Sequence, residues 1–166
     1  KKTASVDGTV RVVYRVFGDF AEATPLVADV LRAASGGGPA PRFFGQILTS
    51  VQAHGYLAWC LGEQGEFVSA IDVAQRGLAE AEREEHRYSQ AVVRGLGGLV
   101  HLRKGNLEEA RRWLEPAVEL ARSLELSLIR SGTIANLGLT YAYRGAVEAG
   151  LALLEEARER QPVLLA

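Results

Sequence analysis

Three histidines and one cysteine are the side chains of this chain that most readily support metal binding or nucleophilic catalysis. His54, His86 and His101 do not form an HExxH pair, so a zinc site would need single ligands from different helices. We expect His101 to lie in a seam between helices and His86 at a solvated corner. Cys60 has apolar neighbours and no identifiable activating base, which favours a buried structural thiol. The sequence therefore predicts no metal site and no nucleophile.

Two glycine-rich stretches invite comparison with phosphate-binding loops. The run GGGPAPR at 36–42 lacks the GK[ST] that completes a P-loop. The run RGLGG at 94–98 lacks both the third glycine and the preceding strand of a dinucleotide fingerprint. The glutamates gather on expected helix surfaces and do not suggest an acid and base pair. We therefore predict that the chain is not an enzyme and that it needs no cofactor.

Composition restricts the classes of protein further. The chain has 166 residues, of which 48% are hydrophobic and 23% are charged, so we expect one folded domain over 1–166. A net charge of -1 argues against a nucleic-acid partner. No apolar run approaches the roughly 20 residues that span a bilayer, and no signal peptide is recognisable. One cysteine fits a reducing compartment, so we expect a cytoplasmic protein. The absence of methionine suggests a fragment of a longer protein.

The elements that carry these residues follow from an internal repeat. Gly18, Gly65, Gly105 and Gly145 are spaced 47, 40 and 40 residues apart, and small and large apolar residues recur at offsets of 3, 4 and 7 on either side of them. Each unit therefore reads as a helix, a glycine turn and a second helix. The turn glycine suits the left-handed conformation that ends many helices. The longer first interval contains the run at 36–42, which reads as an inserted loop.

This repeat predicts an all-α chain of about four helix pairs. The units cover about 5–35, 43–84, 85–124 and 125–161, and 162–166 could begin a further helix. The helix at the start of the first unit is the weakest, because its β-branched residues locally favour a strand. We expect helices near 10–16, 20–34, 43–61, 67–84, 88–103, 107–124, 127–143 and 147–160.

The pattern resembles the tetratricopeptide repeat (TPR) family over nearly the whole chain. The likeness is carried best by the fourth unit, through Leu137, Gly138, Tyr141, Leu154, Ala157 and Pro162, and next by the third, through Gly98, Ala110, Leu114 and Ala117. The resemblance implies a right-handed α-α superhelix, or solenoid, whose concave groove is lined by the first helix of each pair. The period of 40 residues exceeds the usual one of about 34, as in the long repeats of bacterial multidomain signalling ATPases and regulators.

The resemblance also places candidate binding residues on the groove. Small residues, Gly55, Gly95 and Ala135, fall on its floor, where they leave space either for neighbouring helices or for a partner. The partner-contacting positions are Tyr56, Trp59, Glu63, Leu96, Leu99, Arg103, Asn136, Leu139 and Tyr143. Within this set, the apolar residues could form an open strip or could pack on one another, and both alternatives stay open.

We therefore expect a protein-interaction module that binds a peptide or an amphipathic helix in the groove. The lysine, asparagine and arginine clamp of chaperone-binding relatives is absent, since Tyr56, Val92 and Leu96 stand at matching places. The alternative is a regulatory, sensor or oligomerisation domain of a multidomain bacterial transcription regulator, ATPase or nucleotide cyclase. Self-association through uncapped ends is a further possibility, because terminal repeats normally need a polar outer face.

Overall fold

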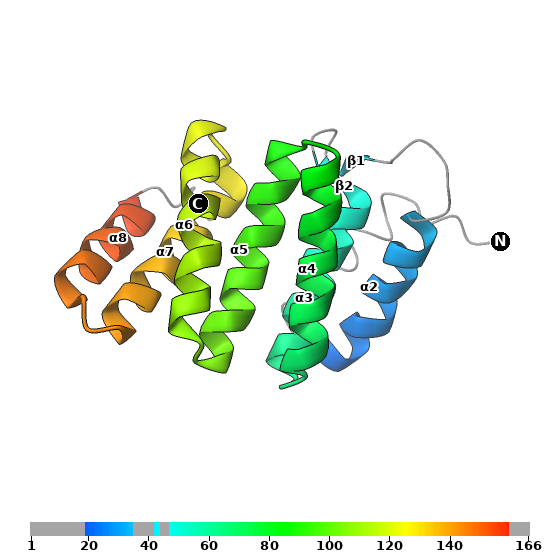
Figure 1. The fold of residues 1–166 in the computed structure, drawn as a ribbon, viewed down its shortest axis with the longest axis horizontal. Helices are drawn as coiled ribbons and strands as arrows, with labels where there is room; N and C mark the ends of the chain where they lie inside the picture. Colours follow the sequence, from blue (N-terminus) through cyan, green and yellow to red (C-terminus); the bar gives the residue numbers. More distant parts are fainter. Residues whose placement is uncertain (1–18, 35–41, 44–46, 160–166) are drawn as a thin grey trace, which may run out of the picture.

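The computed structural model describes residues 19–34, 42–43 and 47–159, and nearly all of these residues are helical. Figure 1 shows the helices side by side in chain order, from α2 (blue) to α8 (red). The expected all-α class is confirmed for this part of the chain. Gly18, the helix expected near 10–16, the loop residues 36–41 and the segment 162–166 lie outside the described residues. The helices are α2 Phe20–Ala34, α3 Thr49–Glu63, α4 Phe67–Arg83, α5 Arg87–Lys104, α6 Leu107–Ser123, α7 Ser127–Tyr143 and α8 Val147–Glu159.

The glycine turns predicted from the repeat are confirmed. Gly65, Gly105 and Gly145 have φ angles of +83°, +82° and +90°, in the left-handed region that a residue without Cβ enters readily. Each lies between the two helices of a pair: α3 and α4, α5 and α6, or α7 and α8. The local conformational preference of one residue type therefore sets three of the helix boundaries.

The second unit begins differently from the prediction. A helix was expected from about residue 43, but α3 begins at Thr49. Before it, β1 (Arg42–Phe43) pairs antiparallel with β2 (Ile47–Leu48). The Leu48 N–H donates to the Ser89 hydroxyl oxygen at 2.9 Å, and Leu48 is buried. The hydrogen bond to Ser89 on α5 thus satisfies a backbone N–H in a segment that the repeat had predicted to be helical.

Packing places the first helices of successive pairs next to each other. Within each pair the two helices pack together, and in addition α3 packs on α5 and α5 on α7. α7 and α8 approach each other closely at two glycines: a Cβ at Gly138 would lie 2.9 Å from the Gly150 carbonyl oxygen, and one at Gly150 would lie 2.6 Å from that of Gly138. A side chain at either position would therefore clash with the backbone of the other helix.

Candidate functional site

An open hollow of about 230 Å³ lies across α3, α5 and α7. Five of the residues that the sequence predicted for the groove line it: Tyr56, Trp59, Gly95, Leu96 and Asn136. The remaining lining residues, which sequence reasoning did not assign, are Gln52, Val92, Ile129, Gly132 and Thr133. Every lining side chain is uncharged at neutral pH.

The aromatic wall of the hollow comes from α3. The rings of Tyr56 and Trp59 lie 6.3 Å apart at a tilt of 35°. Trp59 also meets the ring of Phe20 on α2, edge to face, at 5.7 Å. Edge-to-face aromatic pairs stabilise a fold beyond the contribution from burying the surface area of the two rings. This contact with Phe20 helps to fix the Trp59 ring, which lines the hollow.

A chain of polar contacts continues from the aromatic wall. The Trp59 Nε1–H donates to Glu63 Oε1 at 3.0 Å, and the Arg103 Nε–H donates to the same oxygen at 3.0 Å. Glu63 is on α3 and Arg103 is on α5, so this contact links two successive pairs. Three predicted site residues therefore meet, and the charges of Glu63 and Arg103 compensate each other beside the hollow.

The floor positions are used by neighbouring helices. A Cβ on Gly55 would lie 2.7 Å from Leu96 Cδ1, and one on Gly95 would lie 3.0 Å from Thr133 Oγ1. The small residues on α3 and α5 thus make room for side chains of the next first helix. Ala135 on α7 is half-buried and packs against the core. Close helix packing therefore accounts for the small residue at Gly55, whereas Gly95 both contacts Thr133 and lines the hollow.

The remaining predicted apolar positions lie apart from the hollow. Leu99 and Leu139 are half-buried and pack against the core cluster that contains Leu114 and Ile134. Tyr143, in the last turn of α7, is 67% exposed. The predicted strip is therefore divided: Trp59 faces the hollow, the two leucines join the core, and Tyr143 faces solvent.

Gln52 is one of two polar residues of the hollow, the other being Thr133, that sequence reasoning missed. Its side chain is only 4% exposed and hydrogen-bonds to Tyr56, whose pKa is raised by burial. Its Oε1 accepts no hydrogen bond from the described residues. Gln52 stands four residues before Tyr56 and seven before Trp59, which places all three on one helix face. That spacing is the signal by which it could have been found.

The histidines and the cysteine have structural surroundings. The His101 ring lies 5.7 Å from that of Trp113, and burial lowers the pKa of His101, as expected for a seam residue. His86 lies at the expected corner between α4 and α5, where Glu85 and Arg87 are exposed, but it is itself half-buried and its side chain accepts from the Ser89 N–H at the start of α5. Burial raises the pKa of Cys60 to about 11. Among the described residues no group of three or more potential ligands could hold a metal ion.

His54 belongs to a polar cluster between α3 and α4. Its Nδ1 lies 2.9 Å from the Ser50 carbonyl oxygen and 3.6 Å from Glu80 Oε2, while the Ser50 hydroxyl donates to Glu80 Oε1. The pKa of His54 is lowered, mainly by burial. The histidine does not contact the serine hydroxyl, so the three side chains lack the order of a hydrolytic triad.

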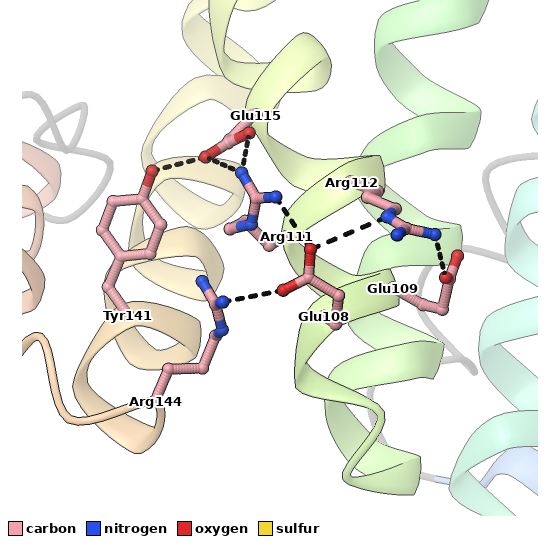
Figure 2. A network of polar contacts seen from close by, with 7 residues as sticks. All are labelled: Glu108, Glu109, Arg111, Arg112, Glu115, Tyr141 and Arg144. Atoms are coloured by element: carbon pink, nitrogen blue, oxygen red, sulfur yellow. Dashed lines mark hydrogen bonds and ion pairs between the residues drawn. The ribbon is translucent and has the colours of Figure 1, made fainter.

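A second polar network, shown in Figure 2, joins α6 to α7. Arg111 donates to both Glu115 oxygens, at 2.8 and 3.0 Å, and to Glu108 at 2.8 Å. From α7, the Tyr141 hydroxyl donates to Glu115 at 2.6 Å and Arg144 pairs with Glu108 at 2.7 Å.

The hydrogen bond from Arg111 holds the pKa of Glu108 below its usual value. Arg112 and Glu109 extend the network along α6. Sequence reasoning missed this network, although the i,i+3 and i,i+4 spacings of its acidic and basic residues on α6 were a local signal for it.

The part of the chain that the structure describes contains no helix that is both long and apolar enough to cross a membrane. Comparison of the chain with models of known protein families finds no match, and comparison with curated proteins finds none.

Proposed function

We propose that this chain is a protein-interaction module that binds a peptide or an amphipathic helix across α3, α5 and α7. In this proposal the helix pairs form a TPR-like right-handed superhelix and the hollow is part of its concave groove. The observation that carries the proposal is the hollow itself, since five residues chosen from the repeat register line it. The three left-handed turn glycines, spaced by 40 residues, also support a repeat architecture.

The chemistry of the hollow favours an apolar anchor on the partner. Its lining is uncharged, and Tyr56 and Trp59 offer aromatic surface with polar tips. The charges nearby, on Glu63 and Arg103, are already paired with each other. Buried aromatic and aliphatic anchors dominate the energetics of most protein interfaces, so a partner with such side chains fits this surface.

The test uses a substitution that fills the hollow without disturbing the core. Gly132 lines the hollow, and a Cβ added there would have no neighbour within 4 Å. Gly132→Glu therefore introduces a charged side chain into an uncharged site while the helix keeps its packing. Peptides are first selected from a random displayed library against the wild-type chain. We expect the variant to bind them at least about tenfold more weakly, at unchanged helicity by circular dichroism.

The matched control is Ala79→Glu, which adds the same charge at an exposed position on α4, away from the hollow. This variant should bind the selected peptides as the wild type does. Equal binding by Gly132→Glu and the wild type would contradict the proposal, as would failure of the library to yield any binding peptide.

Self-association is a second candidate function, and the outer face of α8 favours it. Val147 and Leu151 lie one helical turn apart and are 51% and 54% exposed. Among the described helices, α8 packs mainly on α7. An apolar stripe of this kind could join two copies, which is one form of the oligomerisation role considered above. Light scattering over a concentration series should then show a mass above 17.9 kDa that Leu151→Glu returns to the monomer value.

A further inference from the structure

We infer that the hollow binds a neutral aromatic side chain that donates one hydrogen bond, and that the partner supplies it as a tryptophan. This inference rests on the proposed function and specifies the anchor that the groove recognises. It follows from three properties of the hollow: its lack of charge, its unsatisfied buried acceptor and its volume.

The first property excludes charged anchors. Among the residues that the structure describes, no acidic or basic side chain lines the hollow, and Val92, Leu96 and Ile129 contribute apolar lining together with Trp59. A lysine or carboxylate placed there would lose its hydration without gaining an opposite charge. Glu63, which accepts a hydrogen bond from the lining residue Trp59, is already paired with Arg103. The guest is therefore neutral.

The second property, the unsatisfied buried acceptor, favours a guest that carries a hydrogen-bond donor. Gln52 is only 4% exposed, and it lines the hollow. Its amide is engaged with Tyr56, while its Oε1 receives no donor from the described residues. Buried acceptors are nearly always hydrogen-bonded, and an exception calls for a ligand or a water molecule. An incoming N–H would satisfy this oxygen.

The third property concerns size and shape. The hollow measures about 230 Å³, below the range of about 300–1,000 Å³ that is usual for whole small-molecule ligands. One large side chain is a better match than a cofactor. The tilted rings of Tyr56 and Trp59 present one aromatic wall, on which a flat guest can stack or meet an edge. Tryptophan combines the largest aromatic area with a single N–H donor.

The first experiment compares two small probes that differ at the donor. Indole carries the N–H, and 1-methylindole has the same ring system without it. Each is titrated into the ¹⁵N-labelled chain and followed by NMR. We expect indole to shift the Gln52 side-chain amide and the Trp59 indole signals, and to bind roughly tenfold more tightly than 1-methylindole.

Two variants assign this preference to one oxygen. Gln52→Leu keeps the size of the side chain and removes Oε1, so both probes should bind it with equal affinity. Gln75→Leu, the same change at an exposed position on α4, should retain the preference for indole. The inference is overturned if the wild-type chain binds neither probe, if it binds both equally, or if Gln52→Leu keeps the preference.

The peptides selected above separate this inference from the proposed function. If both hold, the bound peptides share a tryptophan whose replacement by phenylalanine weakens binding more in the wild type than in Gln52→Leu. Bound peptides without such a tryptophan overturn the inference and leave the proposed function standing. A donor-dependent indole site in a chain that binds no peptide overturns the proposed function and the assignment of the guest to a partner.

Discussion

At the scale of single residues, burial decides what the reactive side chains can do. Cys60 is fully buried, and His101 is 6% exposed. Desolvation disfavours the charged form of each group, so it raises the pKa of the thiol and lowers that of the imidazole. Burial thereby favours the neutral forms of Cys60 and His101.

Cys60 should react very slowly with thiol reagents in the folded chain. With a pKa of about 11, roughly one thiol in a thousand is ionised at pH 8, and burial blocks access to it. We expect the rate of labelling by a disulfide reagent at pH 8 to be at least about 100-fold lower than in urea-unfolded chain. Similar rates in the two states would mean that Cys60 is exposed by frequent opening of α3.

The two lowered histidine pKa values make the fold less stable in mild acid. For His54 and His101 the folded pKa lies below the ordinary 6.5, so the unfolded chain binds more protons in the window just below that value. The free energy of unfolding therefore falls as the pH drops from above 6.5 through the folded pKa values. Urea unfolding at pH 7.5 and pH 5.5 measures this loss.

The comparison variant for this pH effect is His101→Phe, which keeps an aromatic ring against Trp113. The charged groups that act on His101 are Glu109 and Lys104, with opposite effects on its pKa, and both remain in the variant. We expect the variant to lose less stability than the wild type between the two pH values. An equal loss would assign the pH dependence to other groups.

At the scale of helices and turns, the backbone conformation sets the effect of each glycine. Gly105, in the third unit, has a φ of +82° in a turn, whereas Gly132, in the fourth unit, lies within α7. The left-handed region is not reserved for glycine here, because Glu85 and Glu125, also 40 residues apart, have φ angles of 49° and 52°. The repeat predicted helix boundaries at these two turns but not their positive φ angles, since a glutamate gives no sequence signal for positive φ.

The same substitution at the two glycines should have opposite effects. Gly132→Ala should raise the free energy of unfolding by about 1 kcal/mol, because alanine is the better helix former and its Cβ enters open space. Gly105→Ala should lower it by about 1 kcal/mol, because Cβ strains a left-handed residue. Denaturant unfolding of both variants checks the sign, and a loss at Gly132 would show that its backbone is not that of a regular helix.

The network between α6 and α7 should contribute measurably through its one hydroxyl. Tyr141→Phe removes the 2.6 Å hydrogen bond to Glu115 and leaves the ring in place, so we expect a loss of about 1 kcal/mol in unfolding free energy. Tyr143→Phe is the matched control, since that side chain is 67% exposed, and its effect should stay within about 0.5 kcal/mol. Equal effects would mean that the hydrogen bond to Glu115 contributes nothing net.

At the scale of the whole molecule, the sequence predicted what the repeat period encodes and missed what depends on contacts between units. The predicted bounds of α2 and α7, at 20–34 and 127–143, match the structure. The predicted ends of α4 and α6 are one residue too late, and α5 extends one residue further at each end than predicted. The predicted start of α8 at 147 matches, and its predicted end at 160 lies outside the described residues. The error at 43–48 arose because the Leu48 N–H is satisfied by Ser89, far along the chain. Gln52 shares a helix face with Tyr56 and Trp59, but its burial and its unsatisfied oxygen depend on packing that the repeat register does not encode.

The contact pattern also predicts an uneven distribution of stability. α5 packs on α3, α4, α6 and α7, whereas α8 packs mainly on α7. A helix with fewer partners opens at a lower cost, so amides in α8 should exchange with deuterium faster than those around Val93 and Val100 in α5, which are buried. Native-state hydrogen exchange in low concentrations of denaturant measures this difference. Equal protection in both helices would mean that the chain unfolds as a single cooperative unit.

One substitution tests the contact between α7 and α8 by the same hydrogen-exchange measurement. Gly150→Ala places a Cβ 2.6 Å from the Gly138 carbonyl oxygen, which forces α8 away from α7. Ala152→Ser, at an exposed position of the same helix, is the control and should leave exchange unchanged. We expect Gly150→Ala to lose protection throughout α8 and to keep it in α3 and α4, which do not pack on α8 to any extent. Because contacts run between neighbouring helices, α8 can then separate while the hollow across α3, α5 and α7 persists, and peptide binding should survive. Loss of protection throughout the chain would instead show that α8 is needed for the whole fold.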